Sequence, residues 1–131
     1  MNMICLHRSA RFYCSTTMIH HKMQFMISSD NINSFADLTG DFNPIHTKDG
    51  VVHGTYLLGL VSGIVAKNYP KSRLLDLNAK FTKACLANTN IEVQVSVPER
   101  PRKLFKALFS VTDIVNGDTL VLGDVKIMLH K

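Results

Sequence analysis

The sequence predicts an α+β domain in which an antiparallel sheet wraps around one long central helix. Two observations indicate this: an apolar segment of helical length at residues 53–68, and β-patterned sequence from residue 71 onward. The 131 residues are enough for one domain with a sizeable core. A single sheet covers only one side of an apolar helix, so we expect a dimer that places two sheets edge to edge.

Composition narrows the function classes without selecting one. A hydrophobic fraction of 46% suits a buried core, and the net charge of +5 is compatible with nucleic acid, an anionic membrane surface or an acidic partner. Nothing else in the sequence supports nucleic-acid binding. Cys5, Cys14 and Cys85 are scattered without metal-ligand spacing, which favours a reducing compartment over disulfides or zinc. The uncharged run at residues 50–66 is short for a bilayer span, and a buried helix is expected.

The first residues differ in composition from the rest. They contain Arg8 and Arg11, several serines and threonines, and no acidic residue before Asp30. This pattern is typical of a mitochondrial transit peptide, with a disordered leader as the alternative. We therefore assign residues 1–21 to a leader and residues 22–131 to a single domain, and expect the mitochondrial matrix as its location.

The first predicted elements of the domain are a strand at residues 22–28 and a helix at residues 31–38. Ser28, Ser29 and Asp30 are all suitable N-cap residues for this helix. Gly40 follows it and is able to take the left-handed conformation that closes helices.

The long helix is predicted from His53 to Asn68, with Tyr69-Pro70 ending it. Apolar residues occupy nearly every side, which predicts a helix covered all round. Gly59 and Gly63 lie four positions apart and weaken a helix. We expect this side to lie tight against a sheet or a partner helix.

Four strands are predicted in the second half, at residues 74–81, 91–97, 105–115 and 119–129. Residues 91–97 (IEVQVSV) alternate cleanly between apolar and polar, as in a half-buried antiparallel strand. Asn116-Gly117 predicts a hairpin turn between the last two strands.

The loop between the two helices holds the candidate chemistry. Asp41 and His46 lie five positions apart, which on a helix would not place them on one face. Asn43-Pro44 separates them and favours a turn. We expect the chain to fold back there, so that the carboxylate and the imidazole converge.

These residues carry a family resemblance. The segments FADLTGDFNPIH at residues 35–46 and VVHG at residues 51–54, followed by an apolar helix, resemble the MaoC-like, hydratase-2 family of hot-dog-fold proteins, and within it the mitochondrial 3-hydroxyacyl-thioester dehydratases. The likeness extends over residues 25–129. It implies reversible, (R)-specific hydration of trans-2-enoyl thioesters of CoA or acyl carrier protein, with no metal or redox cofactor. It also implies a homodimer and, together with the leader, a role in mitochondrial fatty acid synthesis.

The resemblance also implies roles for individual residues. Asp41 and His46 match the catalytic pair, and in the dehydration direction we assign His46 as the acid to the leaving hydroxyl and Asp41 as the base at Cα. Gly54, Asn43 and Ser62 match oxyanion or substrate-binding positions, whereas Pro44 and His53 are expected to be structural. Gly54 suits its position because a missing side chain lets a thioester carbonyl approach the amide at a helix start.

One departure from the family leaves alternatives open. The connection between His46 and the V-H-G motif is shorter than in the family, which normally carries a short helix and loop there. Besides a hydro-lyase, we therefore consider a non-catalytic protein that binds acyl thioesters, and also an acyl thioesterase, which the hot-dog fold permits. A run of basic residues is usually a solvated turn, but together with Lys80 and Lys83 the run Arg100, Arg102 and Lys103 is able to steer an acidic carrier protein or a CoA phosphate.

Overall fold

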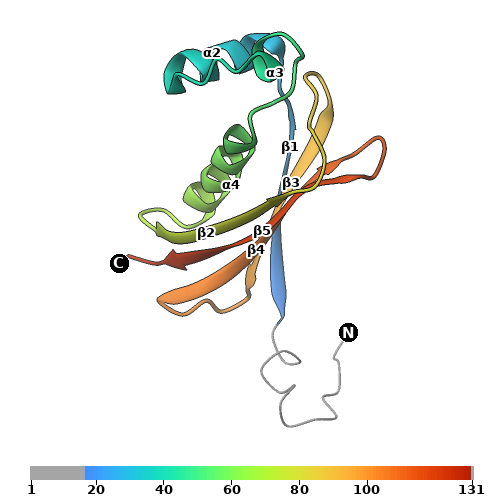
Figure 1. Cartoon of the computed structure of the whole chain (residues 1–131). Coiled ribbons are helices and arrows are strands. Elements are labelled where there is room, and N and C mark those ends of the chain that lie inside the picture. Colours follow the sequence, from blue (N-terminus) through green and yellow to red (C-terminus); the bar gives the residue numbers. More distant parts are fainter. Residues whose placement is uncertain (1–16, 131) are drawn as a thin grey trace.

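A computed structural model describes residues 17–130, which form five strands and three helices (Figure 1). The elements in chain order are β1 (Met18–Met26), α2 (Ser29–Thr39), α3 (Pro44–Thr47), α4 (Gly54–Asn68), β2 (Arg73–Phe81), β3 (Asn90–Pro98), β4 (Leu104–Asp113) and β5 (Thr119–Met128). No helix in this described part of the chain is long and apolar enough to cross a membrane.

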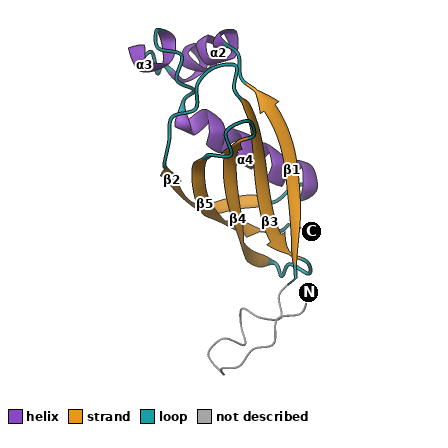
Figure 2. Ribbon diagram, turned by 90° about the vertical axis from the view of Figure 1, so that its right-hand side faces the viewer, coloured by secondary structure: helices purple, strands orange, loops and turns teal. Residues whose placement is uncertain are grey.

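The strands form one antiparallel sheet in the order β1-β3-β4-β5-β2, with β1 and β2 at its two edges. The sheet curves around α4, and α2 and α3 lie together beyond one end of it (Figures 1 and 2). Leu57, Val61, Ile64 and Val65 of α4 are buried against the inward residues of the strands. The predicted α+β architecture, a sheet wrapped around a long helix, is therefore confirmed.

The strand β3 shows how the sheet is built. Ile91, Val93, Val95 and Val97 are fully buried on its inner side, as the alternation in the sequence predicts. Because burial of each such side chain stabilises the fold by roughly 1.5–3 kcal/mol, this alternation fixes which face of the strand meets the helix.

The first strand begins earlier than the sequence predicts. β1 starts at Met18, and its pairing with β3 runs from Met18 opposite Pro98 to Met26 opposite Asn90. Four residues that we assigned to the leader thus belong to the sheet. Residues 1–16 lie outside the described part of the chain, and their role as a transit peptide stays a prediction.

The helix α2 is capped by predicted residues, but at Ser29–Thr39 it is longer at both ends than the predicted 31–38. The Ser28 hydroxyl accepts a hydrogen bond from the amide of Asn31, whose side chain accepts one from the Ser28 amide, forming a capping box. At the other end Gly40 adopts φ 79° and its amide donates to the Ala36 carbonyl.

The side of α4 that carries the two glycines does not face the sheet. Gly59 and Gly63 are exposed, and a Cβ added to either would meet nothing within 4 Å. The expectation of tight packing against the sheet is therefore wrong, because Leu57, Val61, Ile64 and Val65 occupy the inward face. The alternative, a partner helix on this side, stays a prediction.

Candidate active site

The segment from Gly40 to Val52 builds the site with polar turns. The Asp41 carboxylate accepts a hydrogen bond from the Asn43 amide at 3.2 Å, and the Asn43 side chain in turn accepts one from the Ile45 amide at 3.2 Å. Asn43 thereby caps α3, and Pro44 takes the first helical position, where its missing N–H costs nothing. The chain reverses as predicted, but through one turn of helix.

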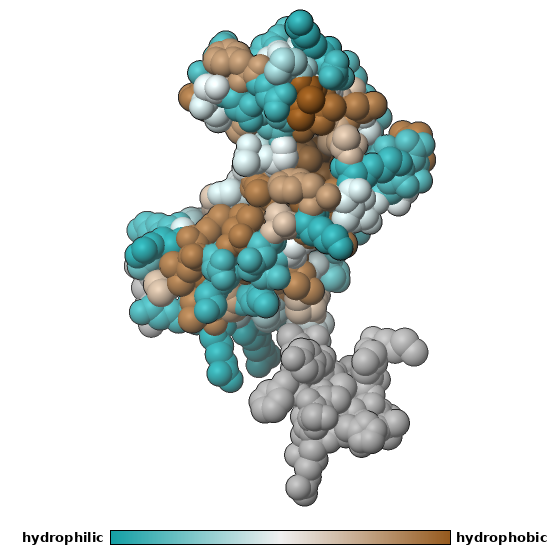
Figure 3. Space-filling view, viewed as in Figure 1, coloured by the Kyte–Doolittle hydropathy of each residue, from teal (hydrophilic) through white to brown (hydrophobic). Residues whose placement is uncertain are grey.

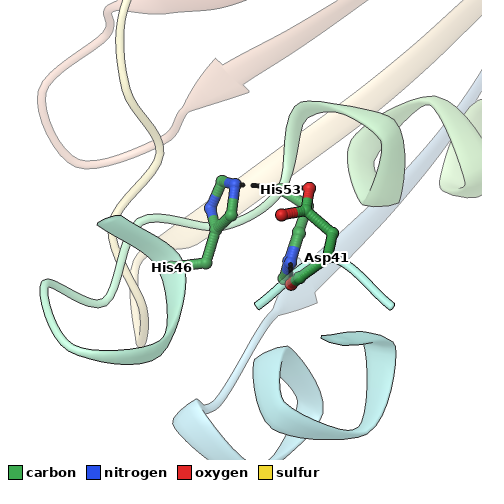
Figure 4. Close-up of side chains that lie close together, drawn as sticks. All are labelled: Asp41, His46 and His53. Atoms are coloured by element: carbon green, nitrogen blue, oxygen red, sulfur yellow. Dashed lines mark hydrogen bonds and ion pairs between the residues drawn. The ribbon is translucent and has the colours of Figure 1, made fainter. Parts of the chain in front are cut away.

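This reversal brings the two predicted proton-transfer groups together. His46 Nε2 lies 3.8 Å from Asp41 Oδ2, and Figure 4 shows both side chains directed at each other. The other ring nitrogen, His46 Nδ1, lies 2.7 Å from the carbonyl oxygen of Val51. Because a carbonyl only accepts hydrogen bonds, Nδ1 carries the proton, and in the neutral ring Nε2 presents a lone pair toward Asp41.

A second histidine, His53, contacts both residues of this pair. His53 is the N-cap residue of α4 and only 1% exposed, and its Nε2–H donates to the Asp41 backbone carbonyl at 3.0 Å. Its ring stacks on His46 with centroids 3.8 Å apart and an interplanar angle of 23°. Phe35 of α2 contacts its ring at a centroid distance of 4.8 Å. His53 therefore holds both the Asp41 backbone and the plane of the His46 ring.

The short connection after His46 is closed by backbone hydrogen bonds. Gly50 adopts φ 71°, and its carbonyl accepts a hydrogen bond from the Ala87 amide. The Val52 amide donates to the Cys85 carbonyl, and Val51 bridges Leu86 in antiparallel fashion. These bonds place the Val51 carbonyl where it orients His46, so this short segment brings the imidazole to Asp41.

The start of α4 supplies hydrogen-bond donors next to the pair. The amides of Tyr56 and Leu57 donate to the His53 carbonyl, whereas those of Gly54 and Thr55 have no acceptor among the described residues. Free amides at a helix start carry partial positive charge. This is the arrangement that stabilises an oxyanion.

Asp41, His46 and the start of α4 all line one cavity of about 490 Å³. Its polar part consists of Asp41, His46, His53, Gly54 and Thr55, and its remaining walls come from Val51, Val52, Leu57, Phe81, Thr82, Lys83, Ala84 and Cys85. A volume of this order suits a small organic group with a few fixed polar contacts.

Three of the predicted site residues do not line this cavity. Ser62 lies eight residues beyond Gly54, which at 1.5 Å per residue is about 12 Å along the helix axis. Asn43 and Pro44 shape α3 and do not reach the cavity wall. Within one chain, the structure therefore brings together Asp41, His46, His53 and Gly54, but neither Ser62 nor Asn43.

The close spacing of Asp41, His46 and His53 raises the question of a metal. One ligand atom of each lies within 4.8 Å of the others. A metal must lie near the plane of each imidazole that binds it, however, and two rings stacked at 3.8 Å do not direct their lone pairs at one point. Hydrogen bonds to carbonyls leave His46 Nε2 and the buried His53 Nδ1 as the ring nitrogens with a free lone pair, and these belong to the two stacked rings. The donor set fits proton transfer better than metal binding.

Two further titratable groups line the cavity. Burial raises the pKa of the Cys85 thiol to about 11, so the thiol is neutral at physiological pH and unsuited to be a nucleophile. Lys83 hydrogen-bonds Asp118, and this bond raises the pKa of its ammonium group. Lys83 thus stays positive at the rim of the cavity.

The basic residues singled out in the sequence fall into two separate groups. Phe81, next to Lys80 and Lys83, pairs with Val121, whereas Leu104, next to Arg102 and Lys103, pairs with Met128. The two groups therefore lie at opposite ends of the sheet, and a combined basic surface is not formed within one chain.

Sequence reasoning missed the residues that reach the site through tertiary contacts. Phe81 comes from the end of β2 and Cys85 from the loop that follows it, and neither carries a local signal. The amide of Thr55 could have been predicted from the sequence, because Thr55 follows Gly54 at the start of the same helix.

The geometry can be compared with known proteins. A match to the family described as MaoC like domain covers residues 15–117. The chain belongs to this family. A relative, 3-hydroxybutyryl-CoA dehydratase of Methylorubrum extorquens, is 30% identical over 113 residues, which cover 72% of this chain and 72% of that protein. The family and this relative identify the chain as a protein of the hydratase and dehydratase class.

Solved structures show the same fold. The (R)-hydratase of A. caviae involved in PHA biosynthesis superposes with a TM-score of 0.77 at 19% identity, covering 86% of this chain and 95% of that one. The R-hydratase PhaJ1 of Pseudomonas aeruginosa gives 0.74 at 21% identity, covering 88% and 81%. A probable thioesterase from Bartonella henselae gives 0.57 at 13% identity over 83% and 88%. The predicted hot-dog fold is thereby confirmed.

Proposed function

We propose that this MaoC-like protein is a hydro-lyase that interconverts (R)-3-hydroxyacyl thioesters and trans-2-enoyl thioesters of CoA or acyl carrier protein. The observation that carries the proposal is the Asp41–His46 pair facing one cavity beside the free amides of Gly54 and Thr55. Addition of water to an enoyl thioester needs proton transfer at two carbons and a stabilised enolate. The cavity offers a group for each need.

In the hydration direction His46 acts on the water. Its Nε2 lone pair, 3.8 Å from Asp41 Oδ2, is spaced so that one water can hydrogen-bond both groups. As the water oxygen forms its bond to Cβ, its proton passes to His46 Nε2. The electron pair of the double bond moves toward Cα and the thioester oxygen.

The resulting enolate is protonated at Cα by Asp41, which receives from His46 the proton that the water gave up. The charge on the enolate oxygen is stabilised meanwhile by the amide of Gly54 or Thr55. Both groups then hold the protons they began with, because one proton has moved from the water through His46 and Asp41 to Cα. The net change is the addition of one water, and dehydration runs the same steps in reverse.

The test follows hydration of crotonyl-CoA through loss of its enoyl absorbance. We expect Asp41→Asn and His46→Ala each to lower the rate by about 10²-fold or more. Leu108→Ala is the control, because this side chain is 54% exposed and does not line the cavity. Thermal unfolding checks that the site variants remain folded.

Two other outcomes would replace the proposal. Release of free thiol from acyl-CoA by the wild type, without hydration, would indicate a thioesterase. Binding of acyl-CoA with no turnover would indicate a non-catalytic protein. Wild-type rates in both site variants would exclude this pair from the reaction.

We also propose that the protein works in the mitochondrial matrix, in fatty acid synthesis. The support is the arginine-containing, acid-free sequence before Asp30. A fusion of residues 1–21 to a fluorescent protein tests this location, and cytosolic fluorescence would refute it. Docking of an acidic carrier protein is part of the proposal, with Lys83 at the cavity rim as its support.

A homodimer completes the proposal. Figure 3 shows apolar residues gathered on the face that α4 and β2 present, and β2 is an edge strand with one unpaired side. Pairing of two β2 edges would satisfy these backbone groups and set two α4 helices side by side. Light scattering of the purified chain distinguishes a dimer from a monomer.

A further inference from the structure

The ring of Phe81 covers the residue that opens α4. A Cβ added to Gly54 would lie 2.5 Å from Phe81 Cε1 and 2.9 Å from Cζ, so the ring fills the space where any other residue has its side chain. Real Cβ atoms do not approach a neighbour this closely. Any side chain at position 54 would therefore displace the ring from its place over the helix start.

The sheet holds the backbone of Phe81, whereas the ring itself is partly exposed. Phe81 is the last residue of β2 and pairs with Val121, and the next amide, that of Thr82, donates to the Leu120 carbonyl at 2.9 Å. The backbone is thus fixed, whereas the side chain is 53% exposed and lines the cavity. A large apolar ring left half exposed at a cavity wall is available to contact a ligand.

We propose that Phe81 is a specificity-determining residue that limits the acyl group of the substrate to short chains. The inference rests on the proposed function and deepens it. A thioester whose oxygen accepts a hydrogen bond from Gly54 brings its Cα and Cβ next to this ring. Carbons further along the chain then meet the apolar residues Val52, Leu57 and Cys85, which line the same cavity as the ring.

Removing the ring makes room in this cavity for a longer chain. The free energy of transition-state binding changes by about 1–3 kcal/mol for one methylene in an apolar pocket, or roughly 10–200-fold in rate. The effect is therefore largest for substrates several carbons longer than crotonyl, and it is seen mainly in KM.

The experiment compares crotonyl-CoA with trans-2-octenoyl-CoA in the wild type, Phe81→Leu and Phe81→Ala. We expect Phe81→Ala to raise the kcat/KM ratio of octenoyl to crotonyl by about 10-fold or more, with Phe81→Leu between it and the wild type. Leu108→Ala, with a similarly exposed apolar side chain on the outer face of β4, should leave the ratio unchanged. A ratio in Phe81→Ala within about two-fold of the wild type overturns the proposal.

A binding measurement separates this proposal from the proposed function. Butanoyl-CoA and octanoyl-CoA are saturated and cannot be hydrated, so calorimetry with them reports the acyl subsite alone. If the protein has no hydratase activity but Phe81→Ala binds octanoyl-CoA more tightly, the proposed function is refuted and the role of Phe81 in the acyl subsite is supported. If the protein hydrates crotonyl-CoA but Phe81→Ala changes neither the octenoyl-to-crotonyl ratio nor octanoyl-CoA binding, the proposed function is supported and the role of Phe81 is refuted. A wild type that binds neither ligand refutes both.

The Gly54 contact provides a second, independent variant. Gly54→Ala forces its methyl group into the ring, and Phe81→Ala removes that clash. If the ring alone makes Gly54 necessary, the double variant recovers the crotonyl-CoA rate of Phe81→Ala. Continued loss in the double variant shows that the added methyl group blocks the thioester itself.

Discussion

The sheet and the segment that carries the site are held together by different forces. In β3 and β4 alternate residues are buried, so these strands are fixed by apolar packing against α4. From residue 41 to residue 49 every residue except His46 is exposed. That segment is fixed by hydrogen bonds that backbone amides donate to side-chain oxygens, such as those of Asp41 and Asn43. Stability and chemistry are thus assigned to different residues, and variants can separate them.

The largest expected effect is on stability and comes from the sheet. Ile91 is completely buried in the core between β1 and β4. We expect Ile91→Ala to lower the free energy of unfolding by about 2–5 kcal/mol, since the cavity it leaves adds to the lost burial. Urea denaturation measures this, with Leu108→Ala as the surface control. His46→Ala should cost less, about 1–3 kcal/mol, because it removes the hydrogen bond to the Val51 carbonyl and the stacking on His53 but leaves the core intact.

Ile91→Ala and His46→Ala together test whether stability and chemistry depend on different residues. Activity per folded molecule should survive in Ile91→Ala and be lost in His46→Ala. If Ile91→Ala abolished turnover while still folded, the core and the site would be coupled, and the separation drawn above would be incorrect.

The same division explains what the sequence could predict. The strand at residues 91–97 was readable because alternation is a local consequence of burial on one face. Asp41 and His46 were found because their motif is local too. The contact of Phe81 with Gly54 spans 27 positions and follows from how the end of β2 packs on α4. The early start of β1 at Met18 depends likewise on pairing with β3.

The stacking of His46 on His53 is another such case. The sequence places these residues seven positions apart, His46 within α3 and His53 just before α4. Their contact arises because Val51 and Val52 pair with residues 85–86, which depends on a segment more than 30 positions away. No local pattern predicts it.

A smaller effect is expected where the two regions meet, at Cys85. Its carbonyl accepts the Val52 amide, and its thiol is buried against the core. Burial raises the pKa of this thiol from 9.0 to about 11. A raised pKa in the folded state means that its contribution is complete below pH 9 and is lost between pH 9 and pH 11, because the unfolded chain ionises first.

The measurement is the pH dependence of urea unfolding in the wild type and in Cys85→Ala. Over this window the wild type should lose up to about 1.4 kcal/mol more per pH unit than the variant. The slopes are compared, not the absolute stabilities, because the substitution also removes some packing. Equal slopes would show that the thiol is not held in its neutral form by the fold.

The smallest effect sharpens the comparison on α4 itself, whose two faces differ. The inward face is buried in the core, whereas Gly59 on the outward face has open space around it. In an isolated chain Gly59→Ala should raise the free energy of unfolding by about 0.5–1 kcal/mol, the difference in helix propensity.

In the proposed dimer the added methyl group stands between two helices, so we expect dimer dissociation to become several-fold easier. Sedimentation over a range of concentrations measures the second effect and urea unfolding at low concentration the first. Stabilisation without any change in dimer strength would place the interface elsewhere, at the β2 edge alone.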